Sequence, residues 1–191
     1  MEEPYINIHQ DLIEECRKGD SKAQLRIYKL YYKAMYNTCF RIVNDSAEAE
    51  DILQESFLDA FRKINSYTGE GSFGKWVKRI VVNNSLDALK KKRSTLPIEE
   101  KQLDLPDEPV RDYNEDEIQF QLQEVKDAIE ILPREYKVII TLYLIEGYDH
   151  EEISEILKIS NNLSRTRYSR ARQKLLSIVK ENRVKNTYIY N

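Results

Sequence analysis

The chain has 191 residues, a formal net charge of −3 and 33% charged residues. This length allows one domain or two small ones, and only five glycines and five prolines argue against a turn-rich β architecture. No apolar run approaches the ~20 residues that span a bilayer, and the N-terminus lacks the pattern of a secretion signal. With Cys16 and Cys39 outside any CxxC spacing, we expect a reduced, cytoplasmic protein without membrane insertion.

Positive charge is concentrated in two blocks of the chain. Residues 75–93 hold seven basic residues against one acid, and residues 158–185 hold nine against one. Between them, residues 94–124 hold ten acids against two basic residues. Two basic blocks separated by an acidic segment indicate two binding sites for a polyanion.

Helical periodicity dominates the first half of the chain. We expect a short helix over residues 8–18 and a longer one capped by Asp20. A third helix begins after Asp45, with Glu48 as the partner in a capping box. Its apolar stripe comprises Ile52, Phe57, Ala60, Phe61 and Ile64. Residues 65–74 have the composition of a loop, and a last helix runs from about Phe73 to Lys92.

The second half predicts a linker followed by about four helices. Residues 94–117 contain three prolines and most of the acids, which is typical of an acidic flexible linker. Helices are expected over 118–131, 134–146 and 150–157, and from 161 onward; Pro133 marks a start and Gly147 an end. The predicted fold is therefore all-α, with helical domains at 1–93 and 118–185 and a tail at 186–191.

Residues 149–176 read as helix, short turn, helix, with Asp149 and Glu152 as a capping-box pair. The second helix contains "NNLSRTRYSRARQKLL", which holds five basic residues and no acid. A projection at about 100° per residue places on the inward side Ser164, Tyr168, Ala171, Leu175 and Ile178. It places outward Thr166, Ser169 and Gln173, with Arg165 and Arg170 beside them and Arg167 and Arg172 nearer the flank. This arrangement fits the recognition helix of a helix-turn-helix domain; the alternative is a solvated basic surface.

Three segments in order resemble the bacterial extracytoplasmic-function (ECF) RNA polymerase sigma factors: "AEDILQESFLDAFRKI", "FGKWVKRIVVNNSLD" and "LPREYKVIITLYLIEGYDHEEISEILKIS". The resemblance covers roughly residues 12–179. It implies that the first domain binds the clamp helices of the largest subunit of RNA polymerase core and opens the downstream promoter element. It implies that the second domain binds the upstream element. Promoter DNA and an anti-sigma factor are the other implied partners, and the free protein is expected to be a monomer.

The resemblance assigns roles to the matching positions. Contact with polymerase core is implied for Asp51, Gln54 and Glu55. Binding of the downstream element and the opened strand is implied for Tyr67, Phe73, Trp76, Arg79 and Asn83, the last being the asparagine of an R-I-x-x-N pattern. Upstream-element binding falls to Arg165, Thr166, Ser169 and Arg170. Phosphate contacts fall to Lys75, Lys78, Lys90, Arg167 and Arg172. The alternatives are that Phe73 and Trp76 are core anchors and that Asp51 and Glu55 are ordinary solvated acids.

The turn and the start of the second helix depart from the family pattern. The family usually has a glycine where Lys158 stands, so Lys158 is expected to adopt a left-handed backbone. The usual E-G-T-like helix start reads Asn161, Asn162, Leu163 here, and Ser160 or Asn161 would cap the helix. Leu163 lacks the threonine hydroxyl, which leaves the promoter preference open.

Other functions have less support. His9 and His150 are the only histidines, and no nucleophile–base set or phosphate-binding loop is visible, so we expect no catalytic residue and no cofactor. There is no cluster of metal ligands either. A helix-turn-helix repressor acting as a dimer is the main rival, and a sigma-like decoy that binds a regulator is a further alternative.

Overall fold

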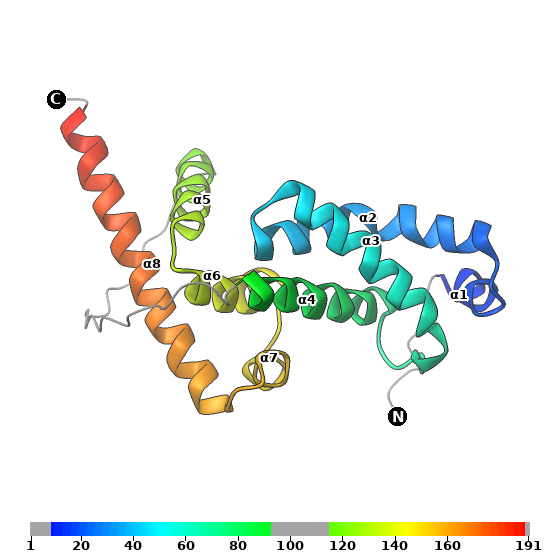
Figure 1. The fold of residues 1–191 in the computed structure, drawn as a ribbon. Helices are drawn as coiled ribbons and strands as arrows, with labels where there is room; N and C mark the ends of the chain where they lie inside the picture. Colours follow the sequence, from blue (N-terminus) through cyan, green and yellow to red (C-terminus); the bar gives the residue numbers. More distant parts are fainter. Residues whose placement is uncertain (1–8, 93–114, 190–191) are drawn as a thin grey trace. The chain divides into compact units, whose positions relative to one another are not determined.

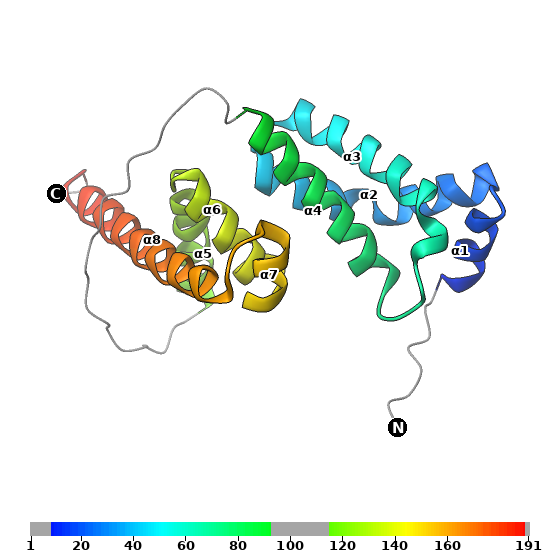
Figure 2. The ribbon, with the colours of Figure 1, turned by 60° about the horizontal axis from the view of Figure 1, so that its bottom comes forward.

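The computed structural model describes the backbone of residues 9–92 and 115–189 and the side chains of residues 9–92 and 123–183. All regular elements within these residues are helical (Figures 1 and 2). The chain divides into two compact units between residues 97 and 98. The all-α prediction is therefore confirmed. The linker predicted over 94–117 lies outside the described residues up to residue 114, and residues 115–117 belong to a helix.

Over residues 9–92, the first unit contains four α-helices and one 3₁₀ turn. In chain order these are α1 (Gln10–Arg17), α2 (Ser21–Val43), α3 (Ser46–Arg62), the 3₁₀ turn η1 (Ile64–Ser66) and α4 (Phe73–Lys92). The three long helices α2, α3 and α4 pack against one another, and α1 packs against α2 and η1 (Figure 1). The face of α3 that is turned away from α2 and α4 is exposed to solvent.

The helix starts follow the capping residues. The Asp20 side chain accepts a hydrogen bond from the backbone N–H of Ala23 at 2.8 Å, and Asp45 accepts one from Glu48 at 2.9 Å. The Glu48 carboxylate, however, forms an ion pair with Lys92 at 2.6 Å. This ion pair joins the start of α3 to the end of α4. The sequence had instead predicted that the Glu48 side chain would complete a capping box with Asp45.

The core of the first unit is formed by one face of each helix. Its fully buried large side chains include Ile13, Ile27, Leu53, Phe73, Val77 and Val81. Four members of the predicted α3 stripe are buried, namely Ile52, Phe57, Ala60 and Ile64. Phe61 is only half-buried, because it lies at the edge of that stripe. Burial of the α3 stripe fixes which residues of the helix face outward.

Among the residues that the structure describes, the second unit contains α5 (Glu115–Glu130), α6 (Arg134–Ile140), a π-helical turn η3 (Thr141–Ile145), α7 (His150–Leu157) and α8 (Asn161–Ile189). Helix α8 packs against α5, α6 and α7 (Figure 2). Helix α5 starts at 115 instead of the predicted 118, and α8 reaches 189, beyond the domain end predicted at 185. The helix predicted over 134–146 is present as α6 and its continuation η3, which ends at 145. Most of the segment predicted as a tail therefore belongs to α8.

The π-helical turn reflects how α6 ends. The Glu146 N–H donates to the carbonyl of Thr141 at 2.9 Å, and the Tyr148 N–H donates to that of Leu142 at 3.0 Å. The second bond closes around Gly147, whose φ of 77° is the left-handed conformation that a glycine adopts without strain. The predicted stop at Gly147 is confirmed, but the widened turn before it was not predicted.

The helix-turn-helix is formed by α7, the turn Lys158–Ser160 and α8. Lys158 has φ 56° and ψ 48°, which confirms the predicted left-handed backbone. The Ile159 N–H donates to the carbonyl of Ser154 at 3.0 Å and closes the turn. The hydroxyl of Ser160 accepts from the N–H of Leu163 at 3.2 Å, so Ser160 rather than Asn161 is the capping residue of α8.

Replacing Lys158 with glycine is expected to stabilise the second unit by about 0.5–1 kcal/mol, because a left-handed residue with a Cβ costs ~1–2 kcal/mol and glycine's greater freedom when unfolded offsets part of that gain. Thermal unfolding followed by circular dichroism measures the change. Asn44 is a matched control, because it ends α2 with φ 57° but asparagine tolerates this conformation well, so Asn44→Gly should gain less. A Lys158→Gly protein with an unchanged or lower midpoint would contradict this expectation.

Candidate functional site

The outer face of α3 carries the residues predicted to bind a protein partner. Asp51, Gln54 and Glu55 are exposed, and Leu58 follows them on the same face. The opposite face is buried through residues that include Leu53, Ser56 and Phe57. Leu58 was missed in the sequence analysis, although an apolar residue seven positions after Asp51 is the signal that it extends this face.

The acids of α3 differ in whether they have an intramolecular partner. Glu48 pairs with Lys92, and Glu50 accepts a hydrogen bond from the hydroxyl of Tyr32 on α2. That bond raises the pKa of Tyr32 to about 12. Asp59 binds Arg62 and Asn84.

Within the described residues, the carboxylates of Asp51 and Glu55 make no hydrogen bond or ion pair. The acids that hold the fold together are thus separate from the two that point to solvent beside Gln54. Two unpaired acids flanking an amide and followed by an exposed leucine form a surface suited to a basic protein partner.

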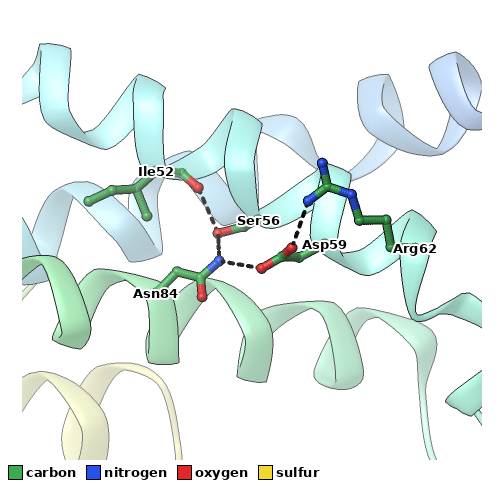
Figure 3. A network of polar contacts seen from close by, with 5 residues as sticks. All are labelled: Ile52, Ser56, Asp59, Arg62 and Asn84. Atoms are coloured by element: carbon green, nitrogen blue, oxygen red, sulfur yellow. Dashed lines mark hydrogen bonds and ion pairs between the residues drawn. The ribbon is translucent and has the colours of Figure 1, made fainter.

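A network of polar side-chain contacts joins α3 to α4 and holds Asn84 between the two helices (Figure 3). The Ser56 hydroxyl donates to the carbonyl of Ile52 at 2.6 Å and accepts from the side-chain amide of Asn84 at 3.1 Å. The same amide lies 3.5 Å from Oδ2 of Asp59, and the other carboxylate oxygen, Oδ1, accepts from the Arg62 guanidinium at 3.2 Å. The neighbouring Asn83 is exposed, because Asn84 takes the inward position.

The rings predicted to bind the opened strand are not equally accessible. Phe73 is 0% exposed and Tyr67 is 2% exposed, whereas Trp76 is half-buried. The three rings pack together, with centroids 5.3 Å apart for Tyr67 and Phe73 and 5.4 Å for Phe73 and Trp76. Phe73 therefore has the burial of the core anchor that the sequence left open as an alternative. Only Trp76 offers part of its ring to solvent.

Tyr67 holds the loop before α4 in place. Its hydroxyl donates to the carbonyl of Gly71 at 2.7 Å, and its own carbonyl accepts from the Arg17 guanidinium on α1. Both ends of the loop are thus tied to the core, and the loop presents a defined surface beside Trp76. In this conformation Tyr67 supports the loop instead of facing a base.

The basic residues of α4 lie around Asn83. Lys75 is exposed, Lys78 and Arg79 are half-buried, and Lys90 is exposed with its ammonium group 3.0 Å from the Asp87 carboxylate. Such an exposed ion pair contributes little to stability, so Lys90 can leave Asp87 and bind a phosphate instead. The helix therefore presents cations on either side of one exposed asparagine.

Helix α8 presents the outward face that the sequence projection predicted. Ser164, Ala171, Leu175 and Ile178 are buried, and Tyr168 is half-buried. On the other side Arg165, Thr166, Ser169 and Arg172 are exposed, whereas Arg167, Arg170 and Gln173 are half-buried. Gln173 is thus less accessible than expected.

Two side chains on the first turns of α8 are already restrained. The Nε–H of Arg165 donates to the side-chain oxygen of Asn161 at 2.9 Å, and the hydroxyl of Thr166 donates to the carbonyl of Asn162 at 2.9 Å. Arg165 donates to Asn161 only through Nε, so its two terminal nitrogens remain for a bidentate acceptor. Asn161, named from the sequence as a possible cap, instead holds the Arg165 side chain, a contact that the sequence did not predict.

An aromatic cluster connects α7, α8 and the π-helical turn. The ring of His150 stacks on Tyr143 with centroids 4.6 Å apart, and Tyr168 lies 4.3 Å from Tyr143. His150 Nδ1 lies 3.0 Å from the hydroxyl of the fully buried Ser164. His150, which stands at the start of α7, is half-buried, and its contacts with Tyr168 and Ser164 join α7 to α8.

The second unit is expected to lose stability as the pH falls. Burial lowers the pKa of His150, the nearby Arg165 lowers it further, and Asp149 partly opposes the shift. The unfolded chain therefore binds the proton more tightly, so the stabilising effect is complete above the ordinary pKa of ~6.5 and is lost as the pH falls from there through the lowered pKa.

Thermal unfolding between pH 7.5 and pH 5 tests this expectation, with His150→Asn as the comparison. The variant keeps a polar group but cannot titrate, so its midpoint should fall less with pH than that of the parent protein. Equal pH dependence in both proteins would show that His150 is not responsible.

Within residues 9–92 and 115–189, no helix combines the length and the apolar character needed to span a membrane. No group of three or more histidine, cysteine, aspartate or glutamate side chains in that part of the chain is arranged to hold a metal ion.

Two helical units, the second a helix-turn-helix with a polar and basic outer face, define a class of DNA-binding transcription proteins. Residues 27–95 match the protein family Sigma-70 region 2, and residues 122–175 match Sigma-70, region 4. The two matches fall within the first and second units respectively.

Sequence identity to individual proteins identifies the family more precisely. The chain is 31% identical to the ECF RNA polymerase sigma factor SigW of Bacillus subtilis, over 85% of this chain and 92% of that protein. It is 30% identical to the ECF RNA polymerase sigma-E factor of Haemophilus influenzae, over 86% and 91% respectively. The chain belongs to the ECF family of RNA polymerase sigma factors. Its function is that of a sigma factor, which directs RNA polymerase to initiate transcription at specific promoters.

Solved structures share this fold at lower identity. CnrH, in a complex with the cytosolic domain of CnrY, matches with a TM-score of 0.55 and 18% identity, over 90% of this chain and 96% of that one. The sigma factor RpoE of Bartonella quintana, in a complex with the anti-sigma factor NepR, matches with a TM-score of 0.55 and 20% identity, over 81% and 95%.

Proposed function

We propose that the two units divide the work of a sigma factor between core binding and promoter recognition. The outer face of α3 with Asp51, Gln54 and Glu55 binds the clamp helices of polymerase core. The observation that carries this assignment is that, of the five acids on α3, only Asp51 and Glu55 lack a partner among the described residues. A helix-turn-helix repressor requires no such surface on a separate unit.

The loop and α4 bind the downstream element and the opened strand. The contacts with DNA come from Trp76, Arg79 and Asn83 on α4. Tyr67 and Phe73 are buried and hold the loop before α4 in place. Lys75, Lys78 and Lys90 hold the phosphates, which makes binding fall steeply with salt. Stacking on Trp76 would offset part of the cost of unstacking a base.

Helix α8 reads the upstream element. Arg165, Thr166, Ser169 and Arg170 line its outer face, and Arg167 and Arg172 contact phosphates on the flanks. The factor itself carries out no catalytic step, since polymerase makes the RNA, and it works in the cytoplasm where polymerase and promoters are found. It is a monomer when free. An anti-sigma partner is part of this proposal, because CnrH and RpoE, which share the fold, are found in complexes with CnrY and with the anti-sigma factor NepR.

The test is co-elution with RNA polymerase core, followed by transcription of a promoter library by the reconstituted holoenzyme. Core binding with promoter-selective transcripts supports the proposal. Core binding without transcripts would indicate a decoy. Failure to bind core, combined with tight binding of a palindromic duplex by a dimer, would indicate a repressor.

Replacing Arg165 with alanine is expected to reduce discrimination between the preferred upstream element and its single-base variants. A bidentate arginine–guanine contact supplies ~1–3 kcal/mol of discrimination, so the loss should be about 5–150-fold at one position. Competition binding by the holoenzyme measures it. Arg172→Ala, on the flank, should instead weaken binding evenly across sequences and lower the salt dependence. Equal behaviour of the two variants would contradict the assignment of Arg165.

A further inference from the structure

Leu163 is an exposed apolar residue at the start of the recognition helix. Its side chain is 37% exposed, although it lies in the first turn of α8. The inward face of this helix is formed by Ser164, Ala171 and Leu175, all of them buried. Leu163 lies to one side of that face, so burial in the core does not account for its position.

The surroundings of Leu163 are those of the DNA-reading surface. Thr166 and Arg170 follow it by three and seven residues, a spacing that places all three on one side of the helix. Asn162, next to it, is exposed. The backbone at Leu163 is held by the hydrogen bond from its N–H to the Ser160 hydroxyl, at 3.2 Å. The backbone of Leu163 is therefore held in place, and the residue lies at the N-terminal end of α8. In helix-turn-helix proteins the N-terminal residues of the recognition helix contact base edges.

The chemistry of leucine restricts what it can recognise. It has no hydrogen-bond donor or acceptor, so it cannot read the polar edge of a base. In the major groove the apolar group that distinguishes one base from the others is the C5 methyl of thymine. We propose that Leu163 is a specificity-determining residue that contacts the methyl group of a thymine in the upstream promoter element. This inference rests on the proposed role of α8.

The experiment removes that methyl group without changing base pairing. Each thymine of the preferred upstream element is replaced in turn by deoxyuridine, and the affinity of the holoenzyme for each promoter is measured by competition. At one position the affinity of the parent holoenzyme should fall about fourfold, which corresponds to the loss of one buried methyl group. In Leu163→Ser that loss should disappear, and in Leu163→Met, which remains apolar, it should persist.

The control is Leu176→Ser, which makes the same change at an exposed leucine of the same helix, 13 residues further along. This variant should keep the full sensitivity to deoxyuridine. Co-elution with core and the thermal midpoint confirm that each variant is folded.

The outcomes separate this inference from the proposed function. A promoter-selective holoenzyme whose sensitivity to deoxyuridine is the same in the parent and in Leu163→Ser would overturn the inference alone. A preferred upstream element without thymine would also overturn it. A parent holoenzyme with no promoter selectivity would contradict the proposed function, and the inference with it.

Discussion

Replacing Phe73 with alanine is expected to lower the free energy of unfolding of the first unit by about 3–5 kcal/mol, the usual cost of removing a buried aromatic ring. The Phe73 side chain is 0% exposed, and its ring packs against those of Tyr31, Tyr67 and Trp76 at centroid distances of 5.6, 5.3 and 5.4 Å. Three rigid rings cannot collapse into the space that the side chain leaves. Chemical denaturation of the full chain, followed at the first unit through Trp76 fluorescence, measures the loss.

Phe40→Ala is the matched control, because it removes the same side chain from α2 at a position that is 37% exposed. Its cost should be well below that of Phe73→Ala. Loss of Phe73 should also release the loop held by Tyr67, so the variant is expected to open promoters less well even at temperatures where it is folded. Similar denaturation midpoints for the two variants would show that Phe73 is not an anchor of this core.

The helices could be predicted largely because their signals are local. Asp20 and Asp45 are capping residues within three positions of the N–H groups that they bind, and Gly147 marks a helix end through its own left-handed backbone. The inward face of α8 could be predicted for the same reason, since 3.6-residue periodicity alone separates Ser164 and Ala171 from Thr166. The left-handed backbone of Lys158, by contrast, could be predicted only from the resemblance to a family that usually has glycine there.

What the sequence did not predict depends on residues far apart in the chain. Glu48 has the spacing of a capping box, but its carboxylate pairs with Lys92, 44 residues away. No local pattern indicates that Tyr143 of η3 and Tyr168 of α8 pack against the ring of His150. The burial of Tyr67 likewise follows from the packing of α4 on the loop, which no local pattern encodes.

The candidate sites show the same division. That Asp51, Gln54 and Glu55 share a face follows from their spacing in the sequence. Which acids of α3 are engaged elsewhere follows only from the fold, because Tyr32, Asn84 and Lys92 come from other helices. Of the five acids on α3, the two that the resemblance assigns to core binding, Asp51 and Glu55, are the two without a partner among the described residues.

Reversing the charge of both acids, as Asp51→Lys combined with Glu55→Lys, is expected to weaken binding to RNA polymerase core by about a hundredfold. Acids that project without a partner are suited to a basic surface, and juxtaposing like charges there costs several kcal/mol. The thermal midpoint should stay near that of the parent protein, because neither carboxylate bonds to another described residue. Titration of labelled protein with core at several salt concentrations measures the affinity.

Two comparisons make the result specific to this face of α3. Glu15→Lys introduces the same reversal at an exposed acid of α1 and should leave core affinity unchanged. Asp51→Asn with Glu55→Gln removes the charges without reversing them, so its loss should fall between those of the parent and the double lysine variant. Since the charges of the double lysine variant are screened by salt, its defect should shrink as ionic strength rises. A defect that persists at high salt, or one that Glu15→Lys reproduces, would place the core-binding surface elsewhere on the first unit.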